Sequence, residues 1–155
     1  GNLIAHQNAI KDAIFKNYSK ILILEDDVYI HKNFKDLHKD LIRNVYKFNI
    51  IYYGCIQKNW KDIDLKNVFY KANKCYGAFA YALDKSVFSK LLEITNNLEK
   101  SFEKCLNELI ENFDKCYVSY PNIFITDLEN GKIHRKRDFE DSSKKFKWIA
   151  SEYEI

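Results

Sequence analysis

Apolar residues at helical spacing open the chain and lead into a short apolar run. In residues 5–18 they recur three or four positions apart, which predicts an amphipathic helix. Residues 21–24 are all branched aliphatics, and such a run predicts a fully buried strand. A second short apolar segment, residues 28–30, comes after three acidic residues.

The next two elements repeat this order. Residues 33–48 carry apolar side chains on one helical stripe, with Asn33 as the expected N-cap, and residues 50–53 predict a strand that stops at Gly54. The order helix, strand, helix, strand is typical of the α/β class. In that class we expect neighbouring strands to be parallel.

The second half of the chain continues with both kinds of element. Residues 68–70 and 76–83 predict strands, and Asp84 is placed to cap a helix after them. Residues 100–113 predict a further helix and residues 117–120 a last strand. The side chains of the strand at 76–83 are unusually small, as where a ligand or another backbone approaches closely.

Length and charge limit the classes of protein that fit. The chain has 155 residues, enough for one domain with a real core, and its 46% hydrophobic content is that of a folded protein. A net charge of +3 from 25 basic and 22 acidic residues is weak and mixed. Composition therefore does not indicate a nucleic-acid partner.

The four cysteines and the lengths of the apolar runs give information about the cellular location of the protein. The cysteines form no CxxC pair, so we expect buried, reduced thiols rather than a zinc site, which favours a cytoplasmic location. No apolar run approaches the roughly 20 residues of a membrane-spanning helix, and the sequence has no signal-peptide pattern.

The strongest candidate for chemistry is the acidic triplet Glu25, Asp26 and Asp27, directly after the run at 21–24. Ligands bind open α/β sheets at the carboxyl ends of strands, and adjacent carboxylates attract a hard divalent cation such as Mg²⁺ or Mn²⁺. Residues two apart in an extended chain point the same way, so Glu25 and Asp27 can converge on one ion. The alternative is an acidic turn that caps the next element of the chain.

Two further residues leave two interpretations open. His6, at the start of the first helix, is either a packed or capping side chain or a ligand-binding one. Trp60, in a loop expected over residues 55–66, either closes the loop onto the core or offers a platform for a sugar ring or a base.

Several motifs together resemble glycosyltransferase family 25, the lipooligosaccharide and procollagen galactosyltransferase group with a GT-A fold. Residues 1–6, a helix and then residues 21–28 are similar to the family's Gly, small residue and His before a helix, followed by a strand that ends in Glu-Asp-Asp. Residues 77–81 resemble its Gly-containing strand, and residues 120–124 its Tyr-Pro-x-Leu-Phe segment. The resemblance implies a GT-A-like, Rossmann-like mixed sheet flanked by helices.

The resemblance also implies an activity and roles for the acidic triplet. The family's reaction moves a hexose from a nucleotide-diphosphate sugar, here UDP-galactose or UDP-glucose, to a hydroxyl of a glycan or hydroxylated polypeptide with Mn²⁺ or Mg²⁺ present. By similarity Asp27 is the metal ligand, with Glu25 beside it. Glu25 and Asp26 hold metal-bound waters or donor hydroxyls, and Gly77 and His6 belong to the donor site.

An inverting transferase also needs a base for the acceptor proton. Glu103 occupies roughly the position of the family's acidic residue, although the family usually has Asp there and Glu99 is a near competitor. The alternative for Glu103 is a solvated helix residue.

Two departures from the family pattern affect the donor site. Ala5 replaces a small polar residue, so the hydrogen bond expected beside His6 is lost. The family's first strand and helix, which hold the nucleotide base, are not supplied before Gly1. We therefore expect either a fragment of a longer chain or an incomplete donor site.

The expected organisation is a GT-A-like core over residues 1–125 and a basic C-terminal tail over residues 126–155. The tail carries a basic cluster at 132–137 that includes Arg137. Arginines and lysines around a diphosphate neutralise its charge, so we expect the tail to pack on or near the active site, with Arg137 at the donor. Basic tails otherwise are solvated surface.

Three functions remain as sequence-based hypotheses. The first is a metal-dependent, inverting glycosyltransferase. The second is a truncated or degenerate sugar-nucleotide-binding module without catalytic activity. The third is a metal-dependent phosphohydrolase, because carboxylates at a strand end suit that chemistry as well.

Overall fold

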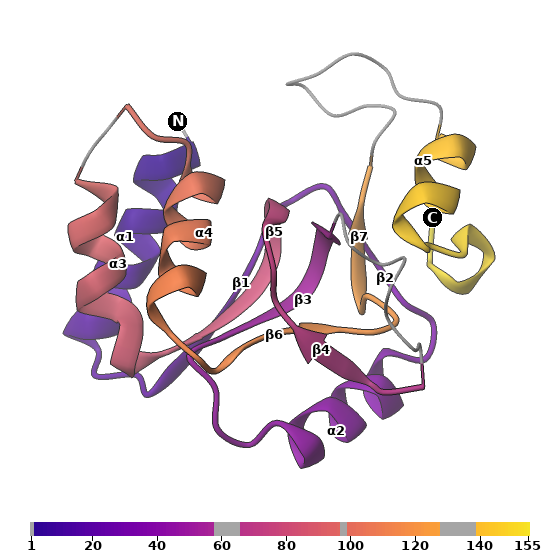
Figure 1. The fold of residues 1–155 in the computed structure, drawn as a ribbon, viewed down its shortest axis with the longest axis horizontal. Coiled ribbons are helices and arrows are strands. Elements are labelled where there is room, and N and C mark those ends of the chain that lie inside the picture. Colours follow the sequence, from indigo (N-terminus) through magenta and orange to yellow (C-terminus); the bar gives the residue numbers. More distant parts are fainter. Residues whose placement is uncertain (1, 58–65, 97–98, 128–138) are drawn as a thin grey trace.

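A computed structural model describes residues 2–57, 66–96, 99–127 and 139–155, and it confirms the α/β class (Figure 1). The helices are α1 (Asn2–Phe15), α2 (Phe34–Asn44), α3 (Phe88–Thr95), α4 (Phe102–Asn112) and α5 (Phe139–Phe146), with short 3-10 helices η2 (Lys85–Val87) and η3 (Ala150–Glu152). The strands are β1 (Lys20–Leu24), β2 (Val28–Ile30), β3 (Ile50–Gln57), β4 (Phe69–Lys71), β5 (Cys75–Asp84), β6 (Cys116–Ser119) and β7 (Phe124–Thr126).

The main sheet is mixed, with strand order β1-β5-β3-β6-β4, and β2 pairs with β7 in a separate two-stranded sheet. Strand β5 lies between β1 and β3 and is antiparallel to both, with Leu24 opposite Ala80 and Tyr52 opposite Tyr81. Only β3 and β6 are parallel neighbours in the described sheet. The expectation that neighbouring strands are parallel is therefore confirmed for β3 and β6 and wrong for the other described pairs of the main sheet, because β5 lies between β1 and β3 and runs opposite to both.

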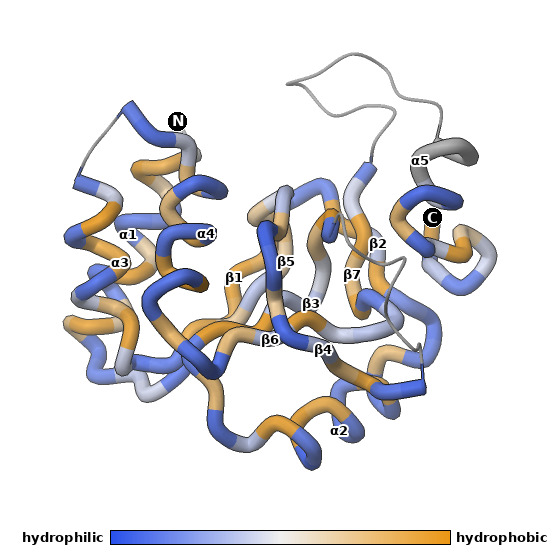
Figure 2. The backbone as a smooth tube through the Cα atoms, in the orientation of Figure 1, coloured by the Kyte–Doolittle hydropathy of each residue, from blue (hydrophilic) through white to orange (hydrophobic). Residues whose placement is uncertain are grey.

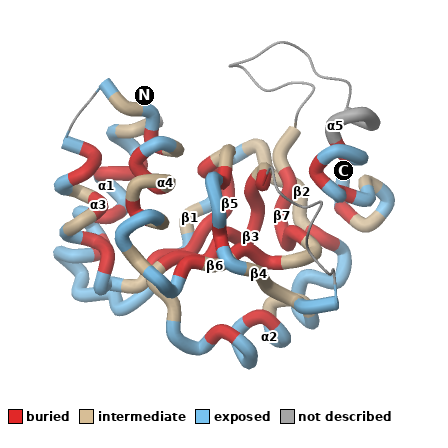
Figure 3. The backbone as a smooth tube through the Cα atoms, in the orientation of Figure 1, coloured by how far each residue is buried: buried red, intermediate tan, exposed pale blue. Residues whose placement is uncertain are grey.

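Two hydrophobic cores cover the two faces of the main sheet. Helices α1, α3 and α4 cover one face, and α2, the β2–β7 pair and the C-terminal segment lie on the other (Figure 1). Figure 2 shows apolar positions recurring along the helices and central strands, and Figure 3 shows β3 buried throughout much of its length. Both faces of the sheet centre are thus shielded from water.

Strand β1 is not the fully buried strand that its sequence predicts. Leu22 is 47% exposed and Leu24 43% exposed, whereas Ile21 and Ile23 are half-buried. Leu22 and Leu24 are exposed because β1 is an end strand of the described sheet. Helix α2 does not extend over the face of β1 that carries these two side chains (Figure 3). An apolar run does not distinguish a central strand from an edge strand.

Element boundaries and one cap also differ from expectation. Helix α1 begins three residues earlier than predicted, and β3 continues through Gly54 to Gln57, so part of the expected loop is strand. Asn33 precedes α2 but makes no side-chain cap; instead its N–H donates to Nδ1 of His31 at 3.0 Å. Asp84 does act as a cap, since its carboxylate accepts the Ser86 N–H at 3.0 Å.

Gly54 allows β7 to approach the main sheet. The N–H of Ile123, just before β7, donates to the Tyr53 carbonyl oxygen at 2.7 Å. A Cβ on Gly54 would overlap the Phe124 carbonyl oxygen and would lie 2.5 Å from a ring carbon of Phe79. Gly54 therefore serves the close approach of another backbone.

Substituting Gly54 with alanine is expected to lower the free energy of unfolding by about 3 kcal/mol, the upper end for an overpacked core. The methyl group would press on the backbone oxygen of Phe124, which cannot move as a side chain can. Urea unfolding followed by circular dichroism measures this loss. An unchanged midpoint would contradict the close approach of β7.

The C-terminal segment shares the second core. Strand β7 spans the expected boundary between residues 125 and 126, and Trp148 and Tyr153 are buried in the same cluster as Phe79. The Trp148 Nε1–H donates to Oδ1 of Asn122 at 2.8 Å, and the Tyr153 hydroxyl donates to the Asn122 carbonyl oxygen at 2.6 Å. These contacts anchor residues 148–153 to the segment between β6 and β7.

Two other features concern the cysteines and the helix lengths. All four cysteines are free and buried, as expected for small core residues. Among the described helices, none is both long and apolar enough to cross a membrane.

Candidate active site

The acidic triplet leaves the carboxyl end of β1 and makes the turn into β2. The Glu25 N–H donates to the Phe79 carbonyl oxygen at 2.8 Å, so the chain is still held to β5 where the triplet begins. Asp26 is exposed, whereas Glu25 and Asp27 are half-buried. The two outer carboxylates are therefore partly enclosed by protein while the middle one meets solvent.

Asp27 carries the least satisfied carboxylate of this turn. Its Oδ1 is buried and accepts no hydrogen bond from the described residues. Burial raises the pKa of Asp27, a hydrogen bond from Thr126 lowers it, and the nearby charges of Glu25 and Asp26 raise it again. A buried oxygen without a donor, close to other carboxylates, is suited to bind a cation.

These residues fit a divalent metal that takes only part of its coordination from protein. Within the described ranges, no group of three or more His, Cys, Asp or Glu side chains could hold an ion alone. Mg²⁺ commonly binds one or two carboxylates and completes its shell with water and substrate phosphates. Asp27 and Glu25 can supply such a pair.

Asp127 brings a further carboxylate to the same turn. Its N–H donates to the Asp27 carbonyl oxygen at 3.0 Å, and its Oδ2 accepts the Tyr29 hydroxyl at 3.1 Å. The contact arises because β2 and β7 are antiparallel, with Val28 opposite Thr126. The sequence does not single out Asp127, since only the short run of residues 124–126 before it indicates a strand at that point.

His6 lies beneath Glu25 rather than at the surface. Its side chain is 5% exposed and stacks on the Phe102 ring, with centroids 4.2 Å apart. Nε2 lies 3.4 Å from Oε1 of Glu25, and Nδ1 lies 2.7 Å from the Tyr81 hydroxyl. An ionised carboxylate only accepts, so a neutral His6 donates from Nε2 and accepts at Nδ1 from Tyr81.

Tyr81 can serve as that donor because it keeps its proton. Burial raises the pKa of Tyr81 well above its ordinary value, and the nearby charge of Glu25 raises it further. The chain of contacts from Tyr81 through His6 therefore fixes the orientation of the Glu25 carboxylate. In this arrangement both ring nitrogens of His6 are engaged by protein.

Glu103 and Gly77 are brought together on the neighbouring flank of the site. The Gly77 N–H donates to Oε1 of Glu103 at 2.8 Å, and Gly77 has a φ of 76°, which favours glycine. Glu103 is in the first turn of α4, next to the Phe102 ring that stacks on His6. The Gly77 N–H therefore already has Glu103 as its hydrogen-bond acceptor.

Contacts link Glu25 through His6 to Phe102, and the next residue of α4, Glu103, accepts the Gly77 N–H. Helices α1 and α4 lie side by side next to β1 and β5 in Figure 1. Three other predicted features, Trp60, Arg137 and the basic cluster at 132–137, lie outside the described residues.

A mixed α/β sheet flanked by helices, with carboxylates at the end of one strand, is consistent with the Rossmann-like fold of glycosyltransferases. The chain matches glycosyltransferase family 25 (LPS biosynthesis protein) over residues 1–147, and it belongs to that family. The protein is accordingly a glycosyltransferase. Comparison with curated proteins gave no match.

Proposed function

We propose that the protein transfers a hexose, galactose or glucose, from a UDP-sugar to a hydroxyl of a glycan or hydroxylated polypeptide. The reaction is proposed to depend on Mn²⁺ or Mg²⁺ and to invert the anomeric centre. The observation that carries the proposal is the buried Oδ1 of Asp27 beside Glu25, which accepts no hydrogen bond from the described residues, in a chain of this family.

The acidic turn is proposed to hold the metal and the donor. Asp27 and Glu25 would bind the ion, and exposed Asp26 is placed to meet donor hydroxyls or metal-bound water. When bound, a divalent cation supplies positive charge that stabilises the diphosphate leaving group. His6 and Tyr81 keep the Glu25 carboxylate oriented, so its contribution needs no reorganisation.

Glu103 is proposed as the base that takes the acceptor proton. Its hydrogen bond within the described part of the chain uses Oε1 and the Gly77 N–H, which leaves Oε2 to accept a proton. Anchoring one oxygen to backbone fixes the direction of the other. Glu99 is exposed and precedes α4, whereas Glu103 is held against β5, so the anchoring favours Glu103.

An assay of UDP release with and without acceptor tests the function. The intact protein is incubated with UDP-galactose or UDP-glucose, Mn²⁺ and a panel of glycan and hydroxylated peptide acceptors. UDP release that requires both metal and acceptor, with an inverted product linkage by NMR, is expected. Donor binding without turnover would instead support the binding module, and release independent of acceptor would support a hydrolase.

His6 is expected to act through Glu25 rather than on the donor. His6→Leu removes the N–H that reaches Glu25 and is expected to weaken Mn²⁺ binding about 10- to 100-fold, as for other residues that orient a metal ligand. His6→Gln, which can still donate, is expected to retain most of the affinity. Mn²⁺ titration by electron paramagnetic resonance measures both, with circular dichroism to verify folding.

Equal Mn²⁺ affinity in the parent protein and in a folded His6→Leu variant would contradict the positioning role. Weakened binding in both variants, with the Gln variant no better than Leu, would likewise show that donation to Glu25 is not what His6 contributes.

A further inference from the structure

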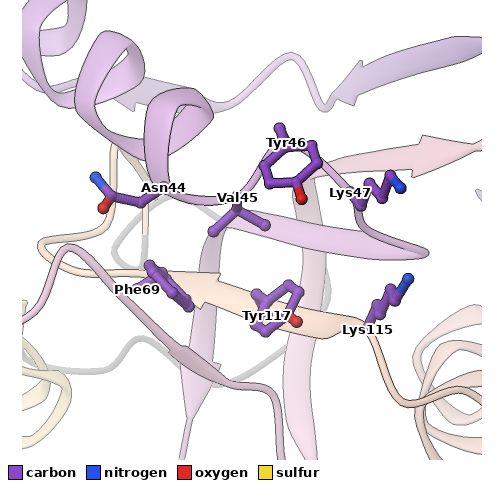
Figure 4. A pocket seen from close by; sticks show the side chains of 7 residues that line it. All are labelled: Asn44, Val45, Tyr46, Lys47, Phe69, Lys115 and Tyr117. Atoms are coloured by element: carbon purple, nitrogen blue, oxygen red, sulfur yellow. The ribbon is translucent and has the colours of Figure 1, made fainter.

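A pocket lies beside β4 and β6, at the other edge of the main sheet from β1 and the acidic turn. It has a volume of about 220 Å³ and is open to solvent (Figure 4). Its lining residues come from the end of α2 and the segment after it, from β4, and from β6 and the residue before it: Asn44, Val45, Tyr46, Lys47, Phe69, Lys115 and Tyr117.

Strand direction separates this pocket from the candidate active site. Strands β1, β3 and β6 run the same way, since β1 and β3 are both antiparallel to β5 and β6 is parallel to β3. The pocket lies beside β6 and β4 and includes Lys115 just before β6, and the acidic turn lies where β1 ends, at the other edge of the sheet. Strand β1 alone, with five residues, is about 16 Å long. No residue is shared between the two sites.

Aromatic rings form the walls of the pocket. In Figure 4 Tyr46 stands on one side, with Phe69 and Tyr117 on the other. Tyr46 is 70% exposed, and the Lys47 ammonium lies 5.7 Å from the centroid of its ring. Phe69 and Tyr117 support each other edge to face, with ring centroids 5.3 Å apart. Such rings offer apolar faces to a flat, ring-shaped ligand.

Positive charge gathers at one end of the pocket. The ammonium groups of Lys47 and Lys115 lie at the same end in Figure 4. Two further lysines lie outside the lining but near it: the Lys71 ammonium is 5.7 Å from the Tyr117 ring centroid, and the Lys20 ammonium is 3.5 Å from the Tyr46 carbonyl oxygen. No acidic side chain within the described ranges forms an ion pair with these four lysines. Clustered like charges of this kind attract an anion.

Asn44 provides a polar group at the other end. Its Nδ2 donates to the Asp40 carbonyl oxygen at 2.7 Å, which leaves Oδ1 as an acceptor for a ligand hydroxyl. A hydroxyl acceptor, exposed aromatic faces and paired ammonium groups together match a ligand that has a ring, hydroxyls and a negative charge.

We propose that this pocket binds an acidic sugar residue, with its ring between Tyr46 and Tyr117 and its carboxylate or phosphate group between Lys47 and Lys115. The site is non-catalytic and goes beyond the proposed transfer reaction. The pocket gives the protein a means of holding an acidic glycan independently of the metal and the donor.

Titration of the intact protein with glucuronate, glucose 6-phosphate, glucose and inorganic phosphate, followed by NMR, tests the proposal. Glucuronate, glucose 6-phosphate or both are expected to bind about tenfold or more tightly than glucose and inorganic phosphate, and the better of the two identifies the preferred acidic group. Tyr46→Ala, and Lys47→Gln with Lys115→Gln, are each expected to weaken that binding about tenfold or more.

Control variants show whether the acidic sugar binds in this pocket or elsewhere on the protein. Lys11→Gln with Lys39→Gln removes two exposed lysines outside the pocket and is expected to leave binding unchanged, as is Asp27→Asn. Binding of glucose as tight as that of the acidic sugars, binding of inorganic phosphate as tight as that of glucose 6-phosphate, unchanged binding in the pocket variants, or no binding at all would each overturn the proposal. Because the Asp27 variant retains this site, failure here is distinguishable from failure of the transferase mechanism.

Discussion

Replacing Asp27 with asparagine is expected to lower kcat/KM for the sugar donor about 1000-fold, the upper range for loss of one group that stabilises developing charge. The substitution is also expected to remove the response to Mn²⁺. Asparagine keeps the size of the side chain but lacks the charge that Asp27 is proposed to offer the metal. Steady-state kinetics over a range of Mn²⁺ concentrations measures both effects.

The same substitution is expected to stabilise the metal-free protein at pH 7. Burial raises the pKa of Asp27 above its ordinary value of 3.8, so the folded chain holds this proton more tightly than the unfolded chain. Stability from this group is therefore greatest at low pH and falls as the pH rises through the folded pKa. The Asp27→Asn variant carries an uncharged amide at neutral pH and avoids that loss.

Thermal unfolding of the metal-free protein tests whether the Asp27→Asn substitution stabilises or destabilises the fold. The midpoint of the Asp27→Asn variant is expected to exceed that of the parent at pH 7, and the difference is expected to shrink near pH 4. Asp36→Asn, which changes an exposed carboxylate on α2, serves as the matched control and is expected to keep full activity. A destabilised Asp27→Asn variant with normal Mn²⁺-dependent activity would contradict the role proposed for Asp27.

Glu103→Gln is expected to lower kcat about 100-fold or more while the protein remains folded. Glutamine can still accept the Gly77 N–H through its amide oxygen, so the contact between α4 and β5 survives. It cannot take the acceptor proton. Single-turnover kinetics with donor and acceptor measures the loss, and donor affinity is expected to stay near that of the parent.

Glu103→Ala separates the two functions of this side chain. It removes both the base and the acceptor of the Gly77 N–H, so it is expected to lose activity as Glu103→Gln does and to be less stable in addition. A Glu103→Gln variant with parental kcat would show that Glu103 only anchors Gly77. In that case the base lies elsewhere.

Local patterns predict the kinds of element better than their arrangement. The spacing of apolar residues places helices near α1, α2 and α4, because each helix turns a stripe of its own sequence toward a core. Strand order depends on contacts between distant segments. Nothing within residues 21–24 or 50–53 indicates that β5 lies between them.

The same limit applies to the site. The acidic triplet is recognisable because its three carboxylates are adjacent in sequence. Asp127 joins it only through the pairing of β2 with β7, about 100 residues apart. Burial of His6 likewise depends on Phe102 from α4 and Tyr81 from β5, so its position in the first helix does not show that it supports Glu25.

Calorimetric titration of the unmodified protein with UDP, with and without Mn²⁺, tests the central claim most directly. If the acidic turn holds a metal that in turn holds the diphosphate, UDP binds in the presence of Mn²⁺ and its affinity falls about 100-fold or more when the metal is chelated. UDP binding of equal affinity with and without Mn²⁺ would contradict a metal-bridged donor site.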